Sequence, residues 1–398
     1  MRPYIAFIRM PLLLLSVTAF LLAQPGQASA SLLTKTSCCT NPQSVEATHG
    51  TAIVITDSTN QPQPSAKTAI PGKQSGIQSM TSSSGKSNKD DPSQSPMYAR
   101  RMLIEDMALV TGIPWYQLAA VDQYERTRSQ THPKKYPKRD GLIAIQFSEI
   151  QWSGLFNPDQ ADHQPETIEL FGGIGQDGDG DGKAERSNDA DVLYTMARLL
   201  LDSGMSKEDF PAAVWNYYQN DRIARRINQF ARIYQHFGSI DLSRHAFPVP
   251  ITSQYSYRST WGAARGWGGR RIHEGTDIFA GYGVPVRSTT YGVIEIMGWN
   301  RYGGWRVGIR DINNIYHYYA HLSGFNKQYK AGDIVQPGEV IGWVGSSGYG
   351  KPGTSGKFPP HLHYGLYRDN GYSDWSFDPY PMLKRWERAE YKARRKAK

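Results

Sequence analysis

Four histidines and one aspartate, all between residues 273 and 363, have the types and spacing needed to bind a metal ion. His273-Glu-Gly-Thr-Asp277 places a carboxylate four residues after an imidazole, and His361-Leu-His363 places two imidazoles one residue apart. His321 lies between these pairs. A catalytic zinc keeps three histidine or carboxylate ligands and an open fourth position, where it acidifies a water molecule and polarises a carbonyl group. The set therefore predicts hydrolytic zinc chemistry.

Two local elements must position these side chains. His361 and His363 follow Phe358-Pro-Pro and begin a strand-like run, and residues two apart on a strand face the same side. One imidazole could then bind the metal while the other reaches the water or the substrate. Gly275 and the strand-like residues 278–279 favour a loop that enters a strand for the first pair.

The histidine between the two pairs has a rival. His317 precedes His321 by four residues in the run Tyr316-His-Tyr-Tyr-Ala-His321, so a regular strand would put both on one face. The phrase Tyr319-Ala-His321-Leu favours His321, and His317 stays the alternative as a structural or groove-lining residue. Glu274 is not read as a metalloprotease base, because residue 277 is an aspartate and the chain lacks His-Glu-x-x-His here.

The surrounding sequence predicts an α+β chain with two domains. Residues 247–380 contain short strand-like runs and glycine-dense turns with no convincing helix between them, which favours an antiparallel sheet. Residues 97–245 instead carry apolar side chains at helical spacing, most clearly over 100–109 and 191–203.

The β-rich part resembles the lysostaphin-type zinc endopeptidases of bacterial cell walls. The resemblance rests on His273-x-x-x-Asp277, Tyr319-Ala-His321-Leu, His361-Leu-His363 and the run Gly332-Asp-Ile-Val-Gln-Pro-Gly338, and it covers about residues 266–381. It implies one zinc bound by His273, Asp277 and His363. It also implies that His321 and His361 act as the catalytic pair that handles protons or stabilises the transition state. The expected fold is a small antiparallel sheet with the metal in a groove.

The helical part resembles lytic transglycosylases, which have a lysozyme-like fold. Residues 113–125, ending at Glu125, are similar to the helix that carries the family's general acid. The usual serine after that glutamate is Arg126 here, and a cation that faced the carboxyl would lower the raised pKa that a glycosidase acid needs. We therefore expect a degenerate domain that binds or positions the wall, with glycan cleavage by Glu125 as the alternative. The acidic loop Asp177–Asp181 has oxygens at alternate positions, so calcium and a solvated turn stay equally open.

The N-terminus has the pattern of a secretory signal: Arg2 and Arg9, an apolar stretch, and Ala28-Ser-Ala30. We predict a signal peptide over 1–30, a flexible linker over 31–96, a helical domain over 97–245, a zinc endopeptidase domain over 246–383 and a basic, solvated tail over 384–398. The net charge of +9 suits an anionic wall polymer as partner, and no motif indicates nucleic acid.

These patterns predict a secreted, wall-associated monomer with no membrane span after signal cleavage. It would hydrolyse amide bonds in the stems or cross-bridges of peptidoglycan. The alternatives are a bifunctional hydrolase that also uses Glu125 and a non-enzymatic wall-binding regulator. The phrases Trp305-Arg-Val-Gly-Ile-Arg-Asp and Trp375-Ser-Phe-Asp-Pro-Tyr resemble an endospore-cortex L-alanyl-D-glutamate endopeptidase, which would imply sporulation.

Overall fold

A computed structural model describes residues 95–204, 208–266, 271–369 and 371–398. The predicted signal peptide and almost all of the predicted linker lie outside these residues. Among the helices that are described, none is both long enough and apolar enough to cross a membrane.

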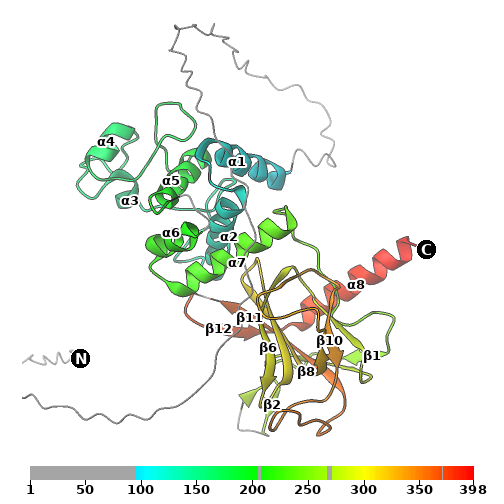
Figure 1. Ribbon diagram of the computed structural model, residues 1–398. Coiled ribbons are helices and arrows are strands. Elements are labelled where there is room, and N and C mark those ends of the chain that lie inside the picture. Colours follow the sequence, from blue (N-terminus) through cyan, green and yellow to red (C-terminus); the bar gives the residue numbers. More distant parts are fainter. Residues whose placement is uncertain (1–94, 205–207, 267–270, 370) are drawn as a thin grey trace, which may run out of the picture. The chain divides into compact units, whose positions relative to one another are not determined.

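Within the described residues, seven helices precede the strands, in the part whose apolar spacing predicts helices (Figure 1). They are α1 (Pro96–Thr111), α2 (Trp115–Thr131), α3 (Glu149–Ser153), α4 (Pro165–Leu170), α5 (Asp189–Leu201), α6 (Asp209–Tyr218) and α7 (Asp221–Phe237). Ser95 caps α1 by accepting from the Tyr98 amide, Pro96 occupies its first turn, and Gly112 ends it in a left-handed conformation at φ 76°. Leu118, from α2, is among the fully buried side chains at the centre of these helices.

The strands form an antiparallel sheet, which confirms the predicted fold of this part. They are β1 (Tyr255–Tyr257), β2 (Ala264–Arg265), β3 (Arg271–Ile272), β4 (Thr276–Ala280), β5 (Pro285–Arg287), β6 (Gly292–Asn300), β7 (Gly304–Asp311), β8 (Ile315–Phe325), β9 (Ile334–Val335), β10 (Val340–Val344), β11 (His361–Asp369) and β12 (Asp374–Phe377). The main sheet has the order β1-β4-β11-β8-β7-β6-β9, while β10 pairs with β5 and β8, and β12 pairs with β11. Strands β2 and β3 form a separate two-stranded sheet. The central strands β4, β11 and β8 carry the histidine motifs, so residues far apart in the sequence become neighbours.

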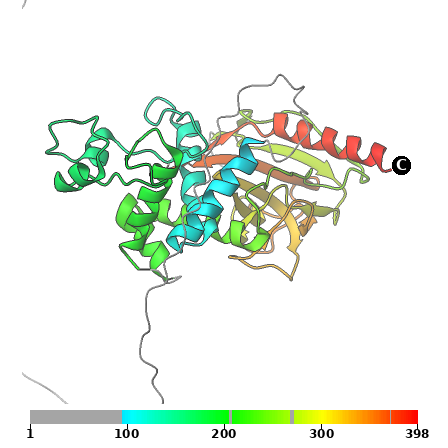
Figure 2. The same ribbon diagram turned by 90° about the horizontal axis from the view of Figure 1, so that it is seen from above.

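One face of the sheet is covered by α8 (Tyr380–Lys396), drawn in red in Figures 1 and 2. Leu383 and Trp386 are buried in the same core as Ile278 and Tyr364. Glu390 accepts from the backbone amide of Phe247 at 2.7 Å. The segment 384–398 therefore differs from the expected solvated tail: its first half packs on the sheet, because an apolar stripe interrupts its Lys and Arg residues. The last residues, from 391 on, are exposed.

Helix α7 is bonded to the sheet through buried charges. Arg226 Nε lies 2.7 Å from Asp369 Oδ2, at the C-terminal end of β11, and Arg222 Nε lies 2.9 Å from the same carboxylate. Val293 and Ile312, from the β-rich part, are buried in the apolar core of the helices. The helical part and the sheet thus share both apolar and ionic contacts.

Candidate metal centre and substrate groove

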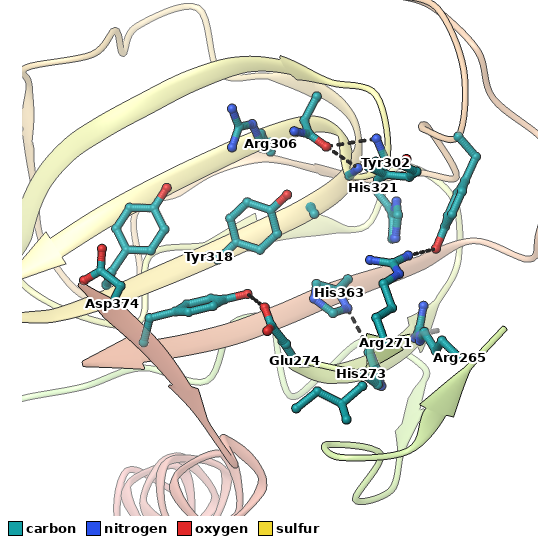
Figure 3. A pocket seen from close by; sticks show the side chains of 17 residues that line it. Arg265, Arg271, His273, Glu274, Tyr302, Arg306, Tyr318, His321, His363 and Asp374 are labelled. Atoms are coloured by element: carbon teal, nitrogen blue, oxygen red, sulfur yellow. Dashed lines mark hydrogen bonds between the residues drawn. The ribbon is translucent and has the colours of Figure 1, made fainter. Parts of the chain in front are cut away.

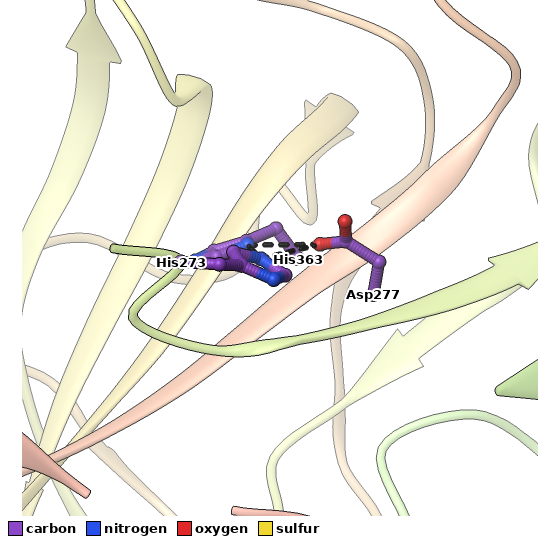
Figure 4. A group of neighbouring side chains, drawn as sticks. All are labelled: His273, Asp277 and His363. Atoms are coloured by element: carbon purple, nitrogen blue, oxygen red, sulfur yellow. Dashed lines mark hydrogen bonds and ion pairs between the residues drawn. The ribbon is translucent and has the colours of Figure 1, made fainter. Parts of the chain in front are cut away.

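Three side chains from the two paired strands β4 and β11 and the loop before β4 converge on one point (Figure 4). His363 Nδ1 lies 2.9 Å from His273 Nε2 and 2.9 Å from Asp277 Oδ1, and His273 Nε2 lies 3.1 Å from that same oxygen. The antiparallel register sets His363 directly opposite Asp277. Ligand atoms of a tetrahedral zinc with bonds of about 2.0–2.1 Å are separated by roughly 3.3 Å. The spacing of the three atoms therefore suits a zinc ion.

The protonation of His273 supports the same conclusion. Its Nδ1 lies 2.9 Å from the carbonyl oxygen of Thr260, which can only accept, so this nitrogen carries the proton. In a ring that binds a metal, Nε2 would present a lone pair beside the Asp277 carboxylate, another acceptor, at 3.1 Å. Two buried acceptors repel each other at this distance unless a cation lies between them. The residues fit the metal that the sequence predicts.

The charge of Asp277 is also held from outside the cluster. Its second oxygen, Oδ2, lies 2.6 Å from Arg265 Nη2. Burial alone would raise the pKa of this carboxyl, but its interactions with the His273 and His363 rings outweigh burial and hold the pKa far below its usual range. Asp277 is therefore an anion, as a metal ligand must be.

His361 lies beside this cluster and points its free nitrogen at it. Nδ1 lies 2.8 Å from the carbonyl oxygen of Pro359, so it carries the proton. Nε2 is buried, has no hydrogen-bond partner in the part of the chain that the structure describes, and lies 3.7 Å from Asp277 Oδ1. Burial lowers the pKa of His361, although the nearby Asp277 acts in the opposite direction. The neutral ring presents a lone pair to the site.

His321 reaches the site because its strand is irregular. Trp305 pairs with Leu322 and Val307 pairs with Tyr319, so two residues, Ala320 and His321, oppose one residue of β7. This is a β-bulge, and His321 has φ +63°, a conformation that non-glycine residues rarely adopt. The bulge turns the His321 side chain toward His361, with ring centroids 4.9 Å apart. Nδ1 lies 2.8 Å from the carbonyl oxygen of Ser347, which leaves Nε2 for the site, and burial together with His363 and His361 lowers the pKa of His321 to about 3.

The same bulge separates His321 from His317, which a regular strand would have placed on the same face. His317 is buried in the core on the other face, where its Nδ1 lies 2.8 Å from Tyr364 Oη and its Nε2 lies 3.2 Å from Asp311 Oδ2. His317 therefore lines no part of the groove. Before the bulge, side chains of β8 alternate between the two faces of the sheet, so Tyr316 and Tyr318 line the groove and Tyr319 is buried in the core. The sequence alone left open which of these tyrosines face the groove.

Gly275 allows His363 to take its position. A Cβ atom at this residue would lie 2.7 Å from His363 Cε1 and 2.6 Å from the carbonyl oxygen of Tyr364. Real Cβ contacts are longer, so any side chain at 275 would displace one of these groups. We expected Gly275 to mark a loop; its further role in the packing of His363 has no signal in the spacing alone.

The cluster forms part of the wall of a groove of about 500 Å³ (Figure 3). Its walls contain five tyrosines and three arginines: Tyr302, Tyr316, Tyr318, Tyr349, Tyr367, Arg265, Arg271 and Arg306. Glu274 and Asp374 also line it. The groove is thus open to an extended chain, aromatic, and rich in cations.

Glu125, the candidate glycan acid, is in a different setting. Both carboxylate oxygens face Arg128 Nη1, at 2.7 and 2.9 Å, and Tyr218 Oη donates to Oε1 at 2.5 Å. Burial raises the pKa of Glu125, with Arg128 acting against it. The adjacent Arg126 instead pairs with Asp122. The arginine that engages Glu125 is therefore not the one that the sequence suggested.

The acidic loop of the helical part folds on itself. Asp177 and Asp179 gather with Asp191 of α5, whereas Asp181 is not part of this cluster. Asp177 accepts from the amides of Gly180 and Gly182 at 2.7 and 2.8 Å, and Asp191 accepts from the amide of Gly178 at 2.8 Å. Backbone N–H groups already engage the Asp177 and Asp191 carboxylates, so their gathering does not require a cation, and calcium is not supported here.

Comparison with known proteins places this site in a class. The sequence profile of peptidase family M23 matches residues 271–375, which contain every residue of the proposed ligand set and both further histidines. Together with the relative described next, this match shows that the chain belongs to the M23 metallopeptidases. The predicted resemblance to lysostaphin-type enzymes is confirmed.

A particular relative covers far more of the chain. The L-Ala–D-Glu endopeptidase of Bacillus subtilis (strain 168) is 57% identical over 315 residues, which are 79% of this chain and 95% of that protein. Lysostaphin from Staphylococcus simulans is 36% identical over 115 residues, or 28% of this chain and 22% of that protein. The solved catalytic domain of that lysostaphin is 32% identical, with a TM-score of 0.27, and the match covers 33% of this chain and 92% of that domain.

Proposed function

We propose that this chain is an exported zinc endopeptidase that hydrolyses the amide bond between L-alanine and D-glutamate in the peptide stems of peptidoglycan. The observation that carries the proposal is the convergence of His273, Asp277 and His363 beside the groove, with the Nε2 atoms of His321 and His361 next to them. The identity of the bond rests on the relative that shares 57% of its residues over most of both chains.

His273, Asp277 and His363 would hold the zinc through Nε2, Oδ1 and Nδ1, the three atoms that face one another. Bound there, zinc supplies Lewis-acid chemistry that activates water and polarises the scissile carbonyl. Arg265 and the Thr260 carbonyl orient Asp277 and His273 from behind, as outer partners of metal ligands do.

His321 and His361 would move the protons. Both rings donate Nδ1–H to a backbone carbonyl, and both have a lowered pKa, so each neutral ring offers Nε2 as an acceptor. One of these nitrogens takes the proton of the attacking water. The resulting imidazolium then donates it to the amine nitrogen that leaves. General acid–base groups of this kind contribute roughly 10²–10⁴-fold to a rate.

The sequence also supports a proposal about where the protein acts. The N-terminal pattern of residues 1–30 indicates export, and the basic composition suits an anionic wall. The predicted domain boundaries, the monomeric state, the lysozyme-like nature of the helices and a role in sporulation stay predictions. Glycan cleavage is not part of the proposal, because Arg128 and Tyr218 engage the Glu125 carboxylate.

Digestion of purified peptidoglycan tests the proposal directly. The zinc-loaded chain should release fragments with new D-glutamate amino termini and L-alanine carboxyl termini, detected by mass spectrometry. These products should vanish when zinc is chelated and return when zinc is restored. Peptide cleavage at another bond would overturn the assigned specificity, and the absence of cleavage with zinc bound would overturn the activity.

The His363→Ala variant tests the site itself. Loss of one of three ligands should abolish zinc binding and hydrolysis together. His236→Ala is the matched control, because His236 lies in α7, outside the groove. Zinc retained at full occupancy with normal hydrolysis in His363→Ala would contradict the ligand assignment.

A further inference from the structure

The three arginines of the groove differ in what they contact. Arg265 Nη2 pairs with Asp277 Oδ2 at 2.6 Å, behind the metal ligands. Arg271 Nη2 lies 3.0 Å from Tyr349 Oη, and its guanidinium lies 5.4 Å from the centre of the Tyr302 ring. Arg306 has no ion pair with any carboxylate that the structure describes, and its buried Nε finds no hydrogen-bond acceptor among the described residues. The guanidinium is half-buried, and a buried donor without a hydrogen bond costs free energy that an acceptor from a bound substrate would offset.

The acidic groups of the groove do not neutralise Arg306. Asp374 lies 2.8 Å from Arg222 and 3.3 Å from Arg310, so two other guanidinium groups already share its charge. Glu274 accepts from Tyr367 Oη at 3.3 Å. The wall around Arg306 is therefore suited to an anion brought by the substrate.

Arg306 is also close to the reacting centre. It lies on β7 opposite the bulge that carries His321. It lines the groove with Tyr318, where its charge opposes the rise in pKa that burial gives that tyrosine, and the Tyr318 ring is 6.0 Å from the ring of His363. One tyrosine therefore separates Arg306 from a proposed metal ligand, and Figure 3 shows these three residues along one stretch of the groove. An extended chain rises by roughly 3.3–3.6 Å per residue, so the residue next to the cut bond can bring its side group to Arg306.

We propose that Arg306 binds the free carboxylate of the glutamate residue on the amine side of the cut bond, and thereby selects that bond. This inference rests on the proposed function. A glutamate residue has two carboxyl groups and only one can continue the peptide chain, so the other stays available as an anion. A planar guanidinium matches a carboxylate with two parallel hydrogen bonds. A glycyl–glycine bond would present no such charge.

Two synthetic peptides test the assignment. Both contain the L-Ala–D-Glu bond and differ only at the free carboxylate of the glutamate, which is kept in one and converted to a carboxamide in the other. We expect the zinc-loaded full chain to cleave the carboxylate peptide with a kcat/KM at least about tenfold higher, the usual size of a charge-assisted contact. In Arg306→Gln this preference should fall to about one, because the rate on the carboxylate peptide drops while the rate on the amide peptide is kept.

Arg271→Gln is the matched control, because it removes a second groove cation whose guanidinium already contacts Tyr349 and Tyr302. The Arg271→Gln variant should keep the tenfold preference for the carboxylate peptide over the carboxamide peptide. Zinc content and the circular dichroism spectrum confirm that each variant is folded, and Arg306→Met, which also removes the charge, replaces Arg306→Gln if the latter is not. Equal cleavage of both peptides by the wild type, or an equal loss on both in the Arg306 variant, overturns the assignment while the endopeptidase activity stands. Cleavage of neither peptide by the zinc-loaded wild type overturns the proposed function and this inference with it.

Discussion

Arg226 Nε lies 2.7 Å from Oδ2 of Asp369, so helix α7 is joined by a buried ion pair to the strand that carries His361 and His363. Asp369 is 3% exposed and Arg226 is 5% exposed. Arg222 shares the same carboxylate, and the Asp369 oxygen Oδ1 also accepts from the amide of Gly371 at 2.7 Å. The network anchors the end of β11 at the border between the helices and the sheet.

The variant Asp369→Asn should lower the free energy of unfolding by about 3 kcal/mol, because it leaves the buried Arg226 guanidinium short of its counter-charge. Urea denaturation followed by tryptophan fluorescence measures the change. Glu105→Gln is the control, since it removes a half-exposed pair with Arg101 and should cost no more than about 0.5 kcal/mol. Similar values for the two variants would contradict a structural role for the Arg226–Asp369 pair.

The same carboxylate makes stability depend on pH. Burial alone would raise the pKa of Asp369, but hydrogen bonds from Arg226 and Arg222 outweigh burial and lower the pKa below 3.8. Glu295 pairs with Arg226 and Arg310. Burial alone would raise the pKa of Glu295, but these two arginines outweigh burial and lower that pKa below 4.5. A carboxyl with a lowered pKa in the folded state contributes stability above its unfolded pKa of about 4, and that contribution is lost as the pH falls through the folded value.

Urea midpoints measured at pH 7, 5, 4 and 3 should therefore be steady down to about pH 5 and then fall. Asp369→Asn should show a smaller decrease from pH 5 to pH 3 than the wild type, since one of the titrating groups is absent. A variant with the same decrease as the wild type would exclude Asp369 from the acid response.

Gly275→Ala should weaken zinc binding without unfolding the sheet. The added methyl group would lie 2.7 Å from His363 Cε1, and either the ring or the backbone of Tyr364 must move. Changes in groups that orient metal ligands reduce affinity by about 10–100-fold, and we expect a loss of that size in competition with a chromophoric chelator. In the control, Gly298→Ala, the new methyl group has no atom within 4 Å, and zinc affinity should not change. Wild-type affinity in Gly275→Ala would show that His363 tolerates the displacement.

The spacing of residue types was enough to predict much of this site and of its fold. His361 and His363 share one face of β11, and Asp277 lies opposite His363, because alternation and antiparallel pairing follow from local sequence. The predicted ligand set His273, Asp277 and His363 is the group that the structure brings together. The helical and antiparallel halves are likewise visible in the period of the apolar residues.

Other features depend on contacts that no local pattern encodes. The bulge at Ala320 and His321 reverses which residues of β8 face the groove, and spacing alone cannot locate it. Trp386 is buried because a docking face exists for it on the sheet, so a tail of basic composition folds as a helix. Arg306 lies in an ordinary strand sequence, and only the folded groove shows that its buried Nε has no acceptor among the described residues.

Glu125→Gln should leave peptide hydrolysis unchanged, since Glu125 lines no part of the zinc groove. It should destabilise the helices by about 1–3 kcal/mol, because Arg128 and Tyr218 lose a charged acceptor. Mass spectrometry of peptidoglycan digests should show no anhydro-sugar products from either protein. Such products from the wild type, absent in Glu125→Gln, would restore the bifunctional alternative.

The two histidines of β8 should respond to substitution in opposite ways. His321→Gln removes a proton acceptor that faces the groove, so kcat should fall by about 10²-fold or more while zinc content and the urea midpoint are kept. His317→Gln disturbs buried contacts with Asp311 and Tyr364 on the other face, so it should lower the free energy of unfolding by about 1–3 kcal/mol and keep kcat. Because the rings lie four residues apart, only the bulge can produce this division. A loss of kcat in His317→Gln with normal stability, or normal kcat in His321→Gln, would mean that the strand runs regularly and that His317 faces the substrate.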